Sequence, residues 1–94
     1  MRELAEDYDK LAAAFGALAH PLRLSLIASI LDGRLCVQDL GEALDRSQPN
    51  ISQHLAVLRE RGLITPERDG RRVCYRLTDE RLAQVIQLAA ECCE

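Results

Sequence analysis

Residues 47–61 carry the side chains with the clearest chemical potential in this chain. Gln, Asn, Ser and His side chains fall in the first two turns of a predicted helix, in which Ile51, Leu55 and Leu58 form one apolar stripe. Amide, hydroxyl and imidazole groups are suited to hydrogen-bonding with the edges of base pairs. We therefore expect a recognition helix over about residues 48–61, with DNA contacts from Ser47, Gln48, Asn50, Ser52, Gln53 and His54. For His54, a partly packed place on the surface is an equal alternative.

The residue types at its ends mark the boundaries of this helix. Ser47 can cap the helix by accepting a backbone N–H bond, Pro49 falls where its missing N–H costs little, and Gly62 follows the last turn. A short helix is predicted over about residues 37–44, and only a tight polar turn separates the two. Two such helices, the second with exposed polar residues at its start, are typical of a helix-turn-helix.

An arginine-rich β-hairpin is predicted directly after the recognition helix, over about residues 63–77. The apolar period changes there from 3.6 to 2, and Asp69-Gly70 is a strong signal for a hairpin turn. Cys74 is expected to be an ordinary strand residue of this hairpin. A hairpin in this position would act as a wing that follows phosphates or a minor groove, and its candidate phosphate contacts are Arg68, Arg71 and Arg72.

The charge along the chain agrees with this placement. The net charge is −3 overall, yet it is −4 over residues 1–45, +4 over residues 46–76 and −3 over residues 77–94. The one basic segment coincides with the predicted recognition helix and wing, as phosphate binding requires. Taken alone, the same segment could also be a solvated arginine-rich surface.

The 94 residues are expected to form one mainly α-helical domain with this small β-hairpin wing. Further helices are predicted over about residues 4–18, from Pro21 to a stop at Gly33, and over 79–93, with His20 capping the second of them. A domain this small gains much from dimerisation, and the first helix carries more apolar surface than one core needs. No apolar run is long enough for a membrane span, so we expect a cytoplasmic protein. Lacking a phosphate loop, a paired acid and base or a metal triad, the chain is expected not to be an enzyme.

Four strings together coincide with one known family: ALAHPLRL over 17–24, LCVQDL over 35–40, SQPNISQHL over 47–55 and GRRVCYRL over 70–77. Over essentially its full length the chain resembles the ArsR/SmtB winged helix-turn-helix repressors. The resemblance implies a homodimer joined through the helices at about 4–18 and 79–93. It further implies binding to an inverted-repeat operator on double-stranded DNA as a repressor, and release when an inducer binds.

The cysteines are the candidate inducer ligands. The last predicted helix lacks the histidine that zinc-sensing members of the family use, and Cys-Val-Gln at 36–38 lacks the second thiol of the arsenite-sensing Cys-Val-Cys. The pair Cys92-Cys93 remains, and trivalent arsenic or antimony binds two or three sulfurs. Some family members resemble this arrangement. We expect Cys92 and Cys93 to bind the metalloid inducer, with Cys36 as a further candidate ligand.

Alternatives to this interpretation stay open. The pair could be two thiols that serve only as small hydrophobic side chains. On the same fold the thiols could form a redox or persulfide switch, with a disulfide between chains or between Cys36 and Cys92 or Cys93. The chain could also be a winged-helix protein-interaction module that does not bind DNA. In a cytosolic protein the four cysteines are expected to be reduced at rest.

Overall fold

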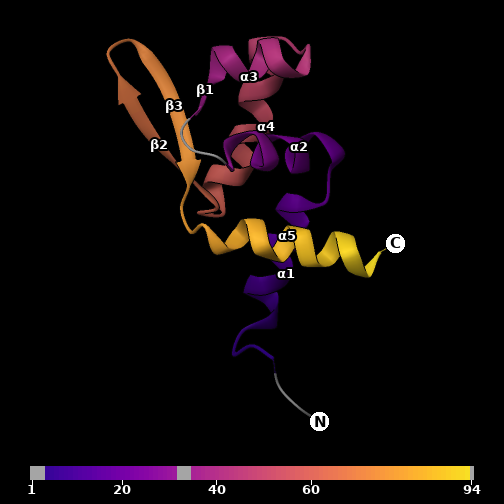
Figure 1. Cartoon of the computed structure of the whole chain (residues 1–94). Coiled ribbons are helices and arrows are strands. Elements are labelled where there is room, and N and C mark those ends of the chain that lie inside the picture. Colours follow the sequence, from indigo (N-terminus) through magenta and orange to yellow (C-terminus); the bar gives the residue numbers. More distant parts are fainter. Residues whose placement is uncertain (1–3, 32–34, 94) are drawn as a thin grey trace.

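The computed structural model describes residues 4–31 and 35–93, which form five helices and a three-stranded antiparallel sheet (Figure 1). The helices are α1 (Tyr8–Leu18), α2 (Pro21–Ile30), α3 (Val37–Leu44), α4 (Gln48–Glu60) and α5 (Arg81–Cys92). The strands are β1 (Leu35–Cys36), β2 (Ile64–Asp69) and β3 (Arg72–Leu77). This arrangement confirms the predicted winged helix-turn-helix, with α3 and α4 as its two helices and β2–β3 as its wing.

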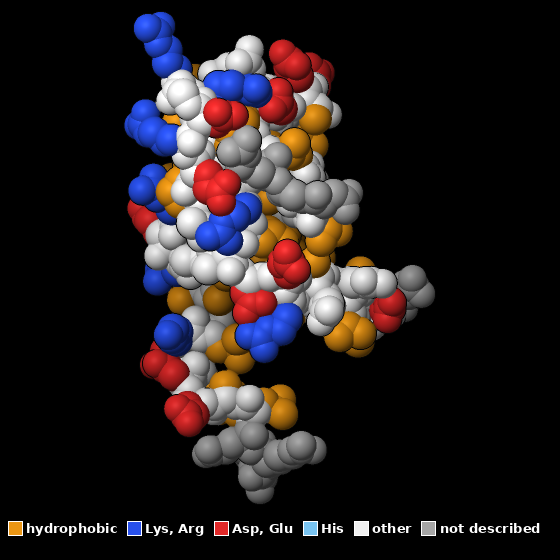
Figure 2. Space-filling view, turned by 60° about the vertical axis from the view of Figure 1, so that its left-hand side comes forward, with side chains coloured by type: hydrophobic (Ala, Val, Ile, Leu, Met, Phe, Trp, Pro, Cys, Tyr) orange, Lys and Arg blue, Asp and Glu red, His pale blue; other side chains and the backbone are white. Residues whose placement is uncertain are grey.

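The molecule is elongated because α1 and α5 project from the body (Figure 1). Its radius of gyration is 14.0 Å, whereas a compact domain of this length has about 12 Å. Figure 2 shows Lys and Arg side chains along one edge of the molecule and hydrophobic side chains around the projecting parts. Large apolar side chains stay exposed on α1 and α5, among them Phe15 at 50% and Leu88 at 60%. These faces lack a covering partner within the described chain.

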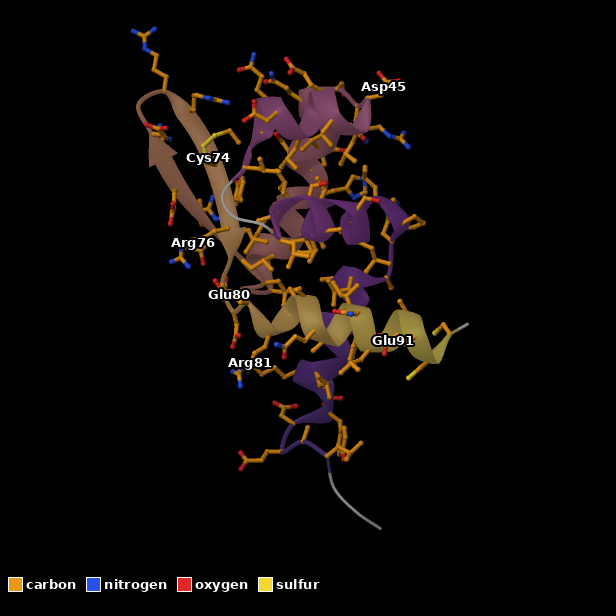
Figure 3. The ribbon with its side chains drawn as sticks, viewed as in Figure 1. Asp45, Cys74, Arg76, Glu80, Arg81 and Glu91 are labelled. Carbon is orange, nitrogen blue, oxygen red and sulfur yellow. A yellow bond between two sulfur atoms is a disulfide. The ribbon has the colours of Figure 1, made fainter. Side chains whose placement is uncertain are left out.

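The sheet has the order β1-β3-β2, so β3 is its central strand. The predicted hairpin is confirmed, and Gly70 makes its turn with a positive φ of 63°. The third strand, β1, was not predicted: it has only two residues and is too short to show a period of 2. It pairs Leu35 with Tyr75 and Cys36 with Cys74. Cys36 and Cys74 are joined by a disulfide, which Figure 3 shows as a yellow bond beside Cys74.

The core lies between α4, α2 and α3. The predicted stripe of Ile51, Leu55 and Leu58 is at most 1% exposed and belongs to the main hydrophobic cluster. Each such side chain contributes about 1.5–3 kcal/mol when it is removed from water. The burial of this stripe therefore sets which side of α4 faces outward. The members of the main hydrophobic cluster that come from α2 and α3 are Leu26, Ile27, Ile30 and Leu40.

Side-chain caps define where the helices begin. Ser47 Oγ accepts a hydrogen bond from the Asn50 N–H at 3.3 Å, and His20 Nδ1 accepts one from the Leu22 N–H at 3.1 Å. Both satisfy backbone donors that a helix leaves unpaired at its start. The caps predicted for Ser47 and for His20 are confirmed.

The first and last helices are shorter than predicted. The Asp7 carboxylate caps α1 by accepting from the Lys10 N–H at 3.0 Å, so the helix begins at Tyr8 instead of about residue 4. Helix α5 begins at Arg81 instead of about residue 79 and ends at Cys92 instead of about residue 93. The predicted stop at Gly33 lies outside the described residues.

Among the described helices, none alone has the length and apolar composition needed to cross a membrane. The pair α1 and α2, bent by 90° at the break between them, meets that test together on length and composition only.

Gly41 allows the tight turn between α3 and α4, and we expect Gly41→Ala to destabilise the fold. A Cβ there would lie 3.0 Å from the Arg46 backbone oxygen, and the Arg46 N–H donates to the Gly41 oxygen at 2.9 Å. Moving this turn should cost about 1–3 kcal/mol, which exceeds the gain of about 1 kcal/mol in helix propensity. The measurement is the free energy of unfolding in urea at one fixed protein concentration.

The matched control for this prediction is Gly16→Ala in α1. A Cβ at Gly16 meets no atom of the described chain within 4 Å. The control should therefore gain up to about 1 kcal/mol of stability from helix propensity alone. Equal effects of the two substitutions would contradict the close approach at Gly41.

Candidate nucleic-acid interface

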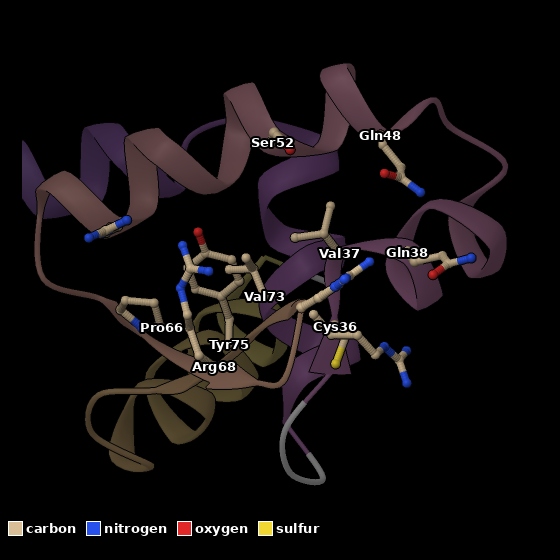
Figure 4. A pocket seen from close by; sticks show the side chains of 12 residues that line it. Cys36, Val37, Gln38, Gln48, Ser52, Pro66, Arg68, Val73 and Tyr75 are labelled. Carbon is tan, nitrogen blue, oxygen red and sulfur yellow. The ribbon is translucent and has the colours of Figure 1, made fainter.

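A groove of about 750 Å³ runs between α4 and the wing (Figure 4). One wall comes from α4 and the start of α3, and the other comes from β2, β3 and the turn between them. The polar and charged side chains that line it are Gln38, Gln48, Ser52, Arg59, Arg68, Arg71 and Arg72. A basic groove with amides and a hydroxyl on one wall has the chemistry of a nucleic-acid surface.

The groove brings together part of the predicted recognition set. Gln48 and Ser52 are exposed and lie about 40° apart on α4 at 100° per residue. Gln53 is exposed on the adjacent outer surface of α4, and Ser47 is exposed at its start. Because the buried stripe holds α4 against α2 and α3, these four side chains are presented outward.

Asn50 and His54 lie on another side of the helix, away from the groove. His54 is about 160° around α4 from Ser52, and its ring lies 4.5 Å from the ring of His20, between centroids. The amide oxygen of Asn50 is buried and has no hydrogen-bond partner among the described residues. The predicted recognition set is therefore divided: His54 contacts His20 and Arg23 at the start of α2, and Asn50 lies about 40° from His54 on the same side of α4.

The surroundings of His54 suit a packing role. Arg23 Nη1 lies 3.4 Å from His54 Nδ1, and Arg23 Nε donates to the Ala17 oxygen at 2.6 Å. Burial, followed by the charges of His20, Arg23 and Arg46, lowers the pKa of His54 below its ordinary value. A neutral imidazole can accept a hydrogen bond from the guanidinium. His54 thus links α4 to the end of α1 and the start of α2.

The three predicted wing arginines all line the groove, but they differ in their partners. Arg72 Nη2 lies 2.8 Å from Asp39 Oδ2, and both side chains are about half exposed. Exposed ion pairs of this kind are worth about 0–1 kcal/mol, so a phosphate could replace the carboxylate at small cost. Arg68 and Arg71 are exposed at the far end of the wing. Arg76, which does not line the groove, pairs with Glu67 at 2.6 Å.

Among the lining residues not predicted from the sequence are the polar side chains of Arg59 and Gln38. Arg59 follows Ser52 by seven residues and lies on the same face of α4, so helical spacing alone could have identified it. Gln38 lies in the first turn of α3, and no sequence pattern marked it. With Arg59, four arginines surround the groove.

The Cys36–Cys74 disulfide corrects two expectations. Cys74 was predicted to be an ordinary strand residue and all the cysteines to be reduced, yet β1 places Cys36 directly opposite Cys74. The disulfides considered for Cys36 joined it to Cys92 or Cys93, whereas the structure joins it to Cys74. In this disulfide state Cys36 has no thiolate to offer as a metal ligand.

Cys92 and Cys93 are free and exposed at the end of α5, which runs away from the sheet (Figure 1). Cys93 is the first residue after the helix, with φ −98° and ψ 10°. Its N–H still donates to the Ala89 and Ala90 oxygens. Two adjacent soft donors at a helix end suit a thiophilic ion if this last turn opens. Within residues 4–31 and 35–93, no group of three or more His, Cys, Asp or Glu side chains is placed to hold a metal ion. One chain therefore supplies two sulfurs here.

Comparison with known proteins gives consistent relatives. Residues 20–65 match the model of the bacterial regulatory protein, arsR family. The chain is 43% identical over 70 residues to the HTH-type transcriptional repressor SmtB of Mycobacterium tuberculosis, covering 74% of this chain and 52% of SmtB. It is 49% identical over 65 residues to the arsenical resistance operon repressor of Escherichia coli, covering 68% and 56%. The chain thus spans about half the length of these two relatives.

Longer matches cover most of both proteins. The biofilm growth-associated repressor of Xylella fastidiosa is 35% identical over 85 residues, covering 86% of this chain and 75% of the repressor. Reduced HlyU from Vibrio cholerae aligns with a TM-score of 0.79 and 34% identity, covering 85% of this chain and 84% of HlyU. The homodimeric winged helix-turn-helix DNA-binding domain Mb0332 from Mycobacterium bovis aligns with a TM-score of 0.83 and 26% identity. The alignment covers 97% of this chain and 91% of Mb0332. By sequence, fold and helix-turn-helix geometry, the chain belongs to the arsR family of bacterial regulatory proteins.

Proposed function

We propose that this chain is a homodimeric repressor that binds operator DNA and leaves it when trivalent arsenic or antimony binds Cys92 and Cys93. The observation that carries the DNA-binding part is the groove, which has Gln48 and Ser52 on one wall and wing arginines on the other. The same proposal places the protein in the cytoplasm, where it meets the operator.

Each part of the groove has a separate role in this proposal. Gln48, Ser52 and Gln53 read base edges in the major groove, because amides and hydroxyls match the donor and acceptor pattern there. Ser47, at the start of α4, contacts the DNA backbone, and the wing arginines hold phosphates. Arg72 does so after it exchanges Asp39 for a phosphate oxygen.

The exposed apolar faces support the proposed dimerisation. Helix α5 has no buried residue within the described chain, and Leu88 and Val85 are 60% and 41% exposed. On α1, Phe15 and Tyr8 are 50% and 52% exposed. A second copy of the chain that covers α1 and α5 would remove these side chains from water, and Mb0332 is a homodimer of the same fold. Two α4 helices spaced by about 34 Å would then enter successive major grooves of an inverted repeat.

The inducer site lies where it can change that spacing. Cys92 and Cys93 end α5, the helix that we assign to the dimer interface. Binding of a metalloid by both sulfurs would reshape this end of the interface and move the two recognition helices relative to each other. A coupling of about 1–3 kcal/mol would lower DNA affinity about 5- to 150-fold. The name of one relative, the arsenical resistance operon repressor of E. coli, is consistent with an arsenic-linked inducer.

The wing assignment predicts a change in the salt dependence of DNA binding. Arg71→Ala should flatten the slope of log K against log salt by about 0.9, because one phosphate contact is lost. Arg72→Ala should have a smaller effect, since Asp39 already partly neutralises this arginine. Fluorescence anisotropy with the protein's own upstream DNA over a salt series measures these slopes.

The control for the wing variants is Arg81→Ala. Arg81 is exposed on α5 and pairs with Asp79 at 2.6 Å, outside the groove. Its replacement should leave the slope unchanged. If the salt slope of Arg71→Ala equals that of the wild type, the wing does not hold phosphate. If the wild type binds no promoter fragment at low salt, a protein-interaction module is favoured.

The recognition face predicts a different response. Gln48→Ala should weaken binding to the operator by about 1–3 kcal/mol while the salt slope stays the same, because a base contact and no phosphate contact is removed. Binding to unrelated DNA should be nearly unchanged. Competition between operator and unrelated duplexes gives both values, and an equal loss on the two duplexes would contradict base reading by Gln48.

The inducer assignment predicts release by metalloids in the wild type only. Arsenite and antimonite should dissociate the wild-type complex in the presence of a phosphine reductant, and zinc should not. The variant Cys92→Ser/Cys93→Ser should stay bound, whereas Cys36→Ser/Cys74→Ser should still be released. Release that persists in Cys92→Ser/Cys93→Ser would move the site away from the C-terminal pair.

A further inference from the structure

The Cys36–Cys74 disulfide lies at the groove wall, and its two halves differ in access. Cys74 is fully buried on the central strand, whereas Cys36 is 7% exposed and lines the groove. Figure 4 shows Cys36 next to Val37 among the lining side chains. Thiol–disulfide exchange requires a thiolate to reach one sulfur in line with the bond. Access therefore favours attack at Cys36 with Cys74 as the leaving group.

The charge of the groove selects the attacking reagent. Arg59, Arg68, Arg71 and Arg72 line it, and its lining contains no Asp or Glu side chain among the described residues. A concave basic surface concentrates anions and stabilises a thiolate relative to a thiol. A volume of about 750 Å³ also lies within the range of small-molecule sites.

We propose that Cys36 Sγ is a thiol-exchange site that anionic low-molecular-weight thiols reach through the groove. The thiolate RS⁻ attacks Cys36 Sγ, the bond between Cys36 and RS forms, and the bond between Cys36 and Cys74 breaks. Cys74 leaves as a thiolate and takes up a proton. A second RS⁻ attacks the RS sulfur, forms RS–SR and releases Cys36 as a thiolate, so the disulfide is reduced by two electrons that the small thiols supply.

The position of the bond gives this exchange a structural consequence. Strand β1 pairs with β3 at two residues only, and Cys36 is also the N-cap of α3. Beyond the short backbone connection from α4 to β2, the disulfide is thus a covalent cross-link between the start of the helix-turn-helix and the central strand of the wing. Its reduction loosens the wing arginines relative to α4. This consequence for DNA rests on the proposed function, whereas the exchange chemistry does not.

The first experiment compares three small thiols of similar size and different charge. The variant Cys92→Ser/Cys93→Ser in its disulfide form is treated with 2-mercaptoethanesulfonate, 2-mercaptoethanol or cysteamine, and rates are compared per thiolate. The anionic thiol should react at least about 5-fold faster than the neutral one and the cationic thiol slower still, and the differences should shrink as salt rises. Mass spectrometry of quenched samples should find the mixed disulfide on Cys36.

Two results would overturn the exchange site: equal rates for the three thiols, or a mixed disulfide on Cys74. The variant Arg68→Ala/Arg71→Ala provides the matched test, because both side chains are exposed and their loss leaves the core intact. It should reduce the preference for the anionic thiol while its reaction with 2-mercaptoethanol stays unchanged. Arg81→Ala, outside the groove, should keep the full preference. A full preference in the double arginine variant would also count against entry through the groove.

A second experiment adds operator duplex to the same reaction. If DNA occupies the groove, it should slow exchange by the anionic thiol at least about 5-fold at saturation. Reduced protein should in turn bind the duplex more weakly and with a flatter salt slope. A charge preference without protection by DNA would support the exchange site and count against the DNA interface of the proposed function. Protection by DNA without a charge preference would support the DNA interface and count against the exchange site.

Discussion

The burial of one apolar stripe on α4 determines what the rest of the molecule can do. Ile51, Leu55 and Leu58 are almost completely removed from water against α2 and α3. Since a helix rotated by one residue would turn about 100°, this packing leaves a single orientation for every polar side chain on α4. Gln48 and Ser52 consequently face the wing, and His54 faces His20 and Arg23.

The two cysteine pairs lie in different parts of the fold. Cys36–Cys74 joins the helix-turn-helix to the wing within one chain, directly beside the basic groove. Cys92 and Cys93 lie at the end of α5, which runs away from the sheet (Figure 1) and carries the exposed side chains of Val85 and Leu88. In the proposed repressor, chemistry at the first pair would act on a single DNA-contacting unit, whereas chemistry at the second would act on the distance between two units. Both proposed effects would require only small movements, because DNA geometry constrains the spacing of the recognition helices and the position of the wing.

Local signals predicted most of the helices, and their limits have physical causes. Ser47, His20 and the stripe of α4 mark their elements through interactions within a few residues, so the sequence shows them directly. Strand β1 exists because β3 pairs with it, and two residues have no period of their own. The disulfide depends on that pairing and could not be predicted. The place of His54 depended on the position of α2, whereas Arg59 could have been found from its spacing to Ser52.

The distribution of charge explains how an acidic chain can present a DNA surface. The flanking segments carry −4 and −3, and only residues 46–76 are basic, at +4. DNA approaching the acidic segments is repelled, so the field favours an approach with the groove in front. The Arg72–Asp39 pair moderates the groove further, since Asp39 neutralises part of its positive charge. In the proposed complex, acidic segments on both sides of one basic segment would therefore limit non-specific binding and orient the protein on its operator.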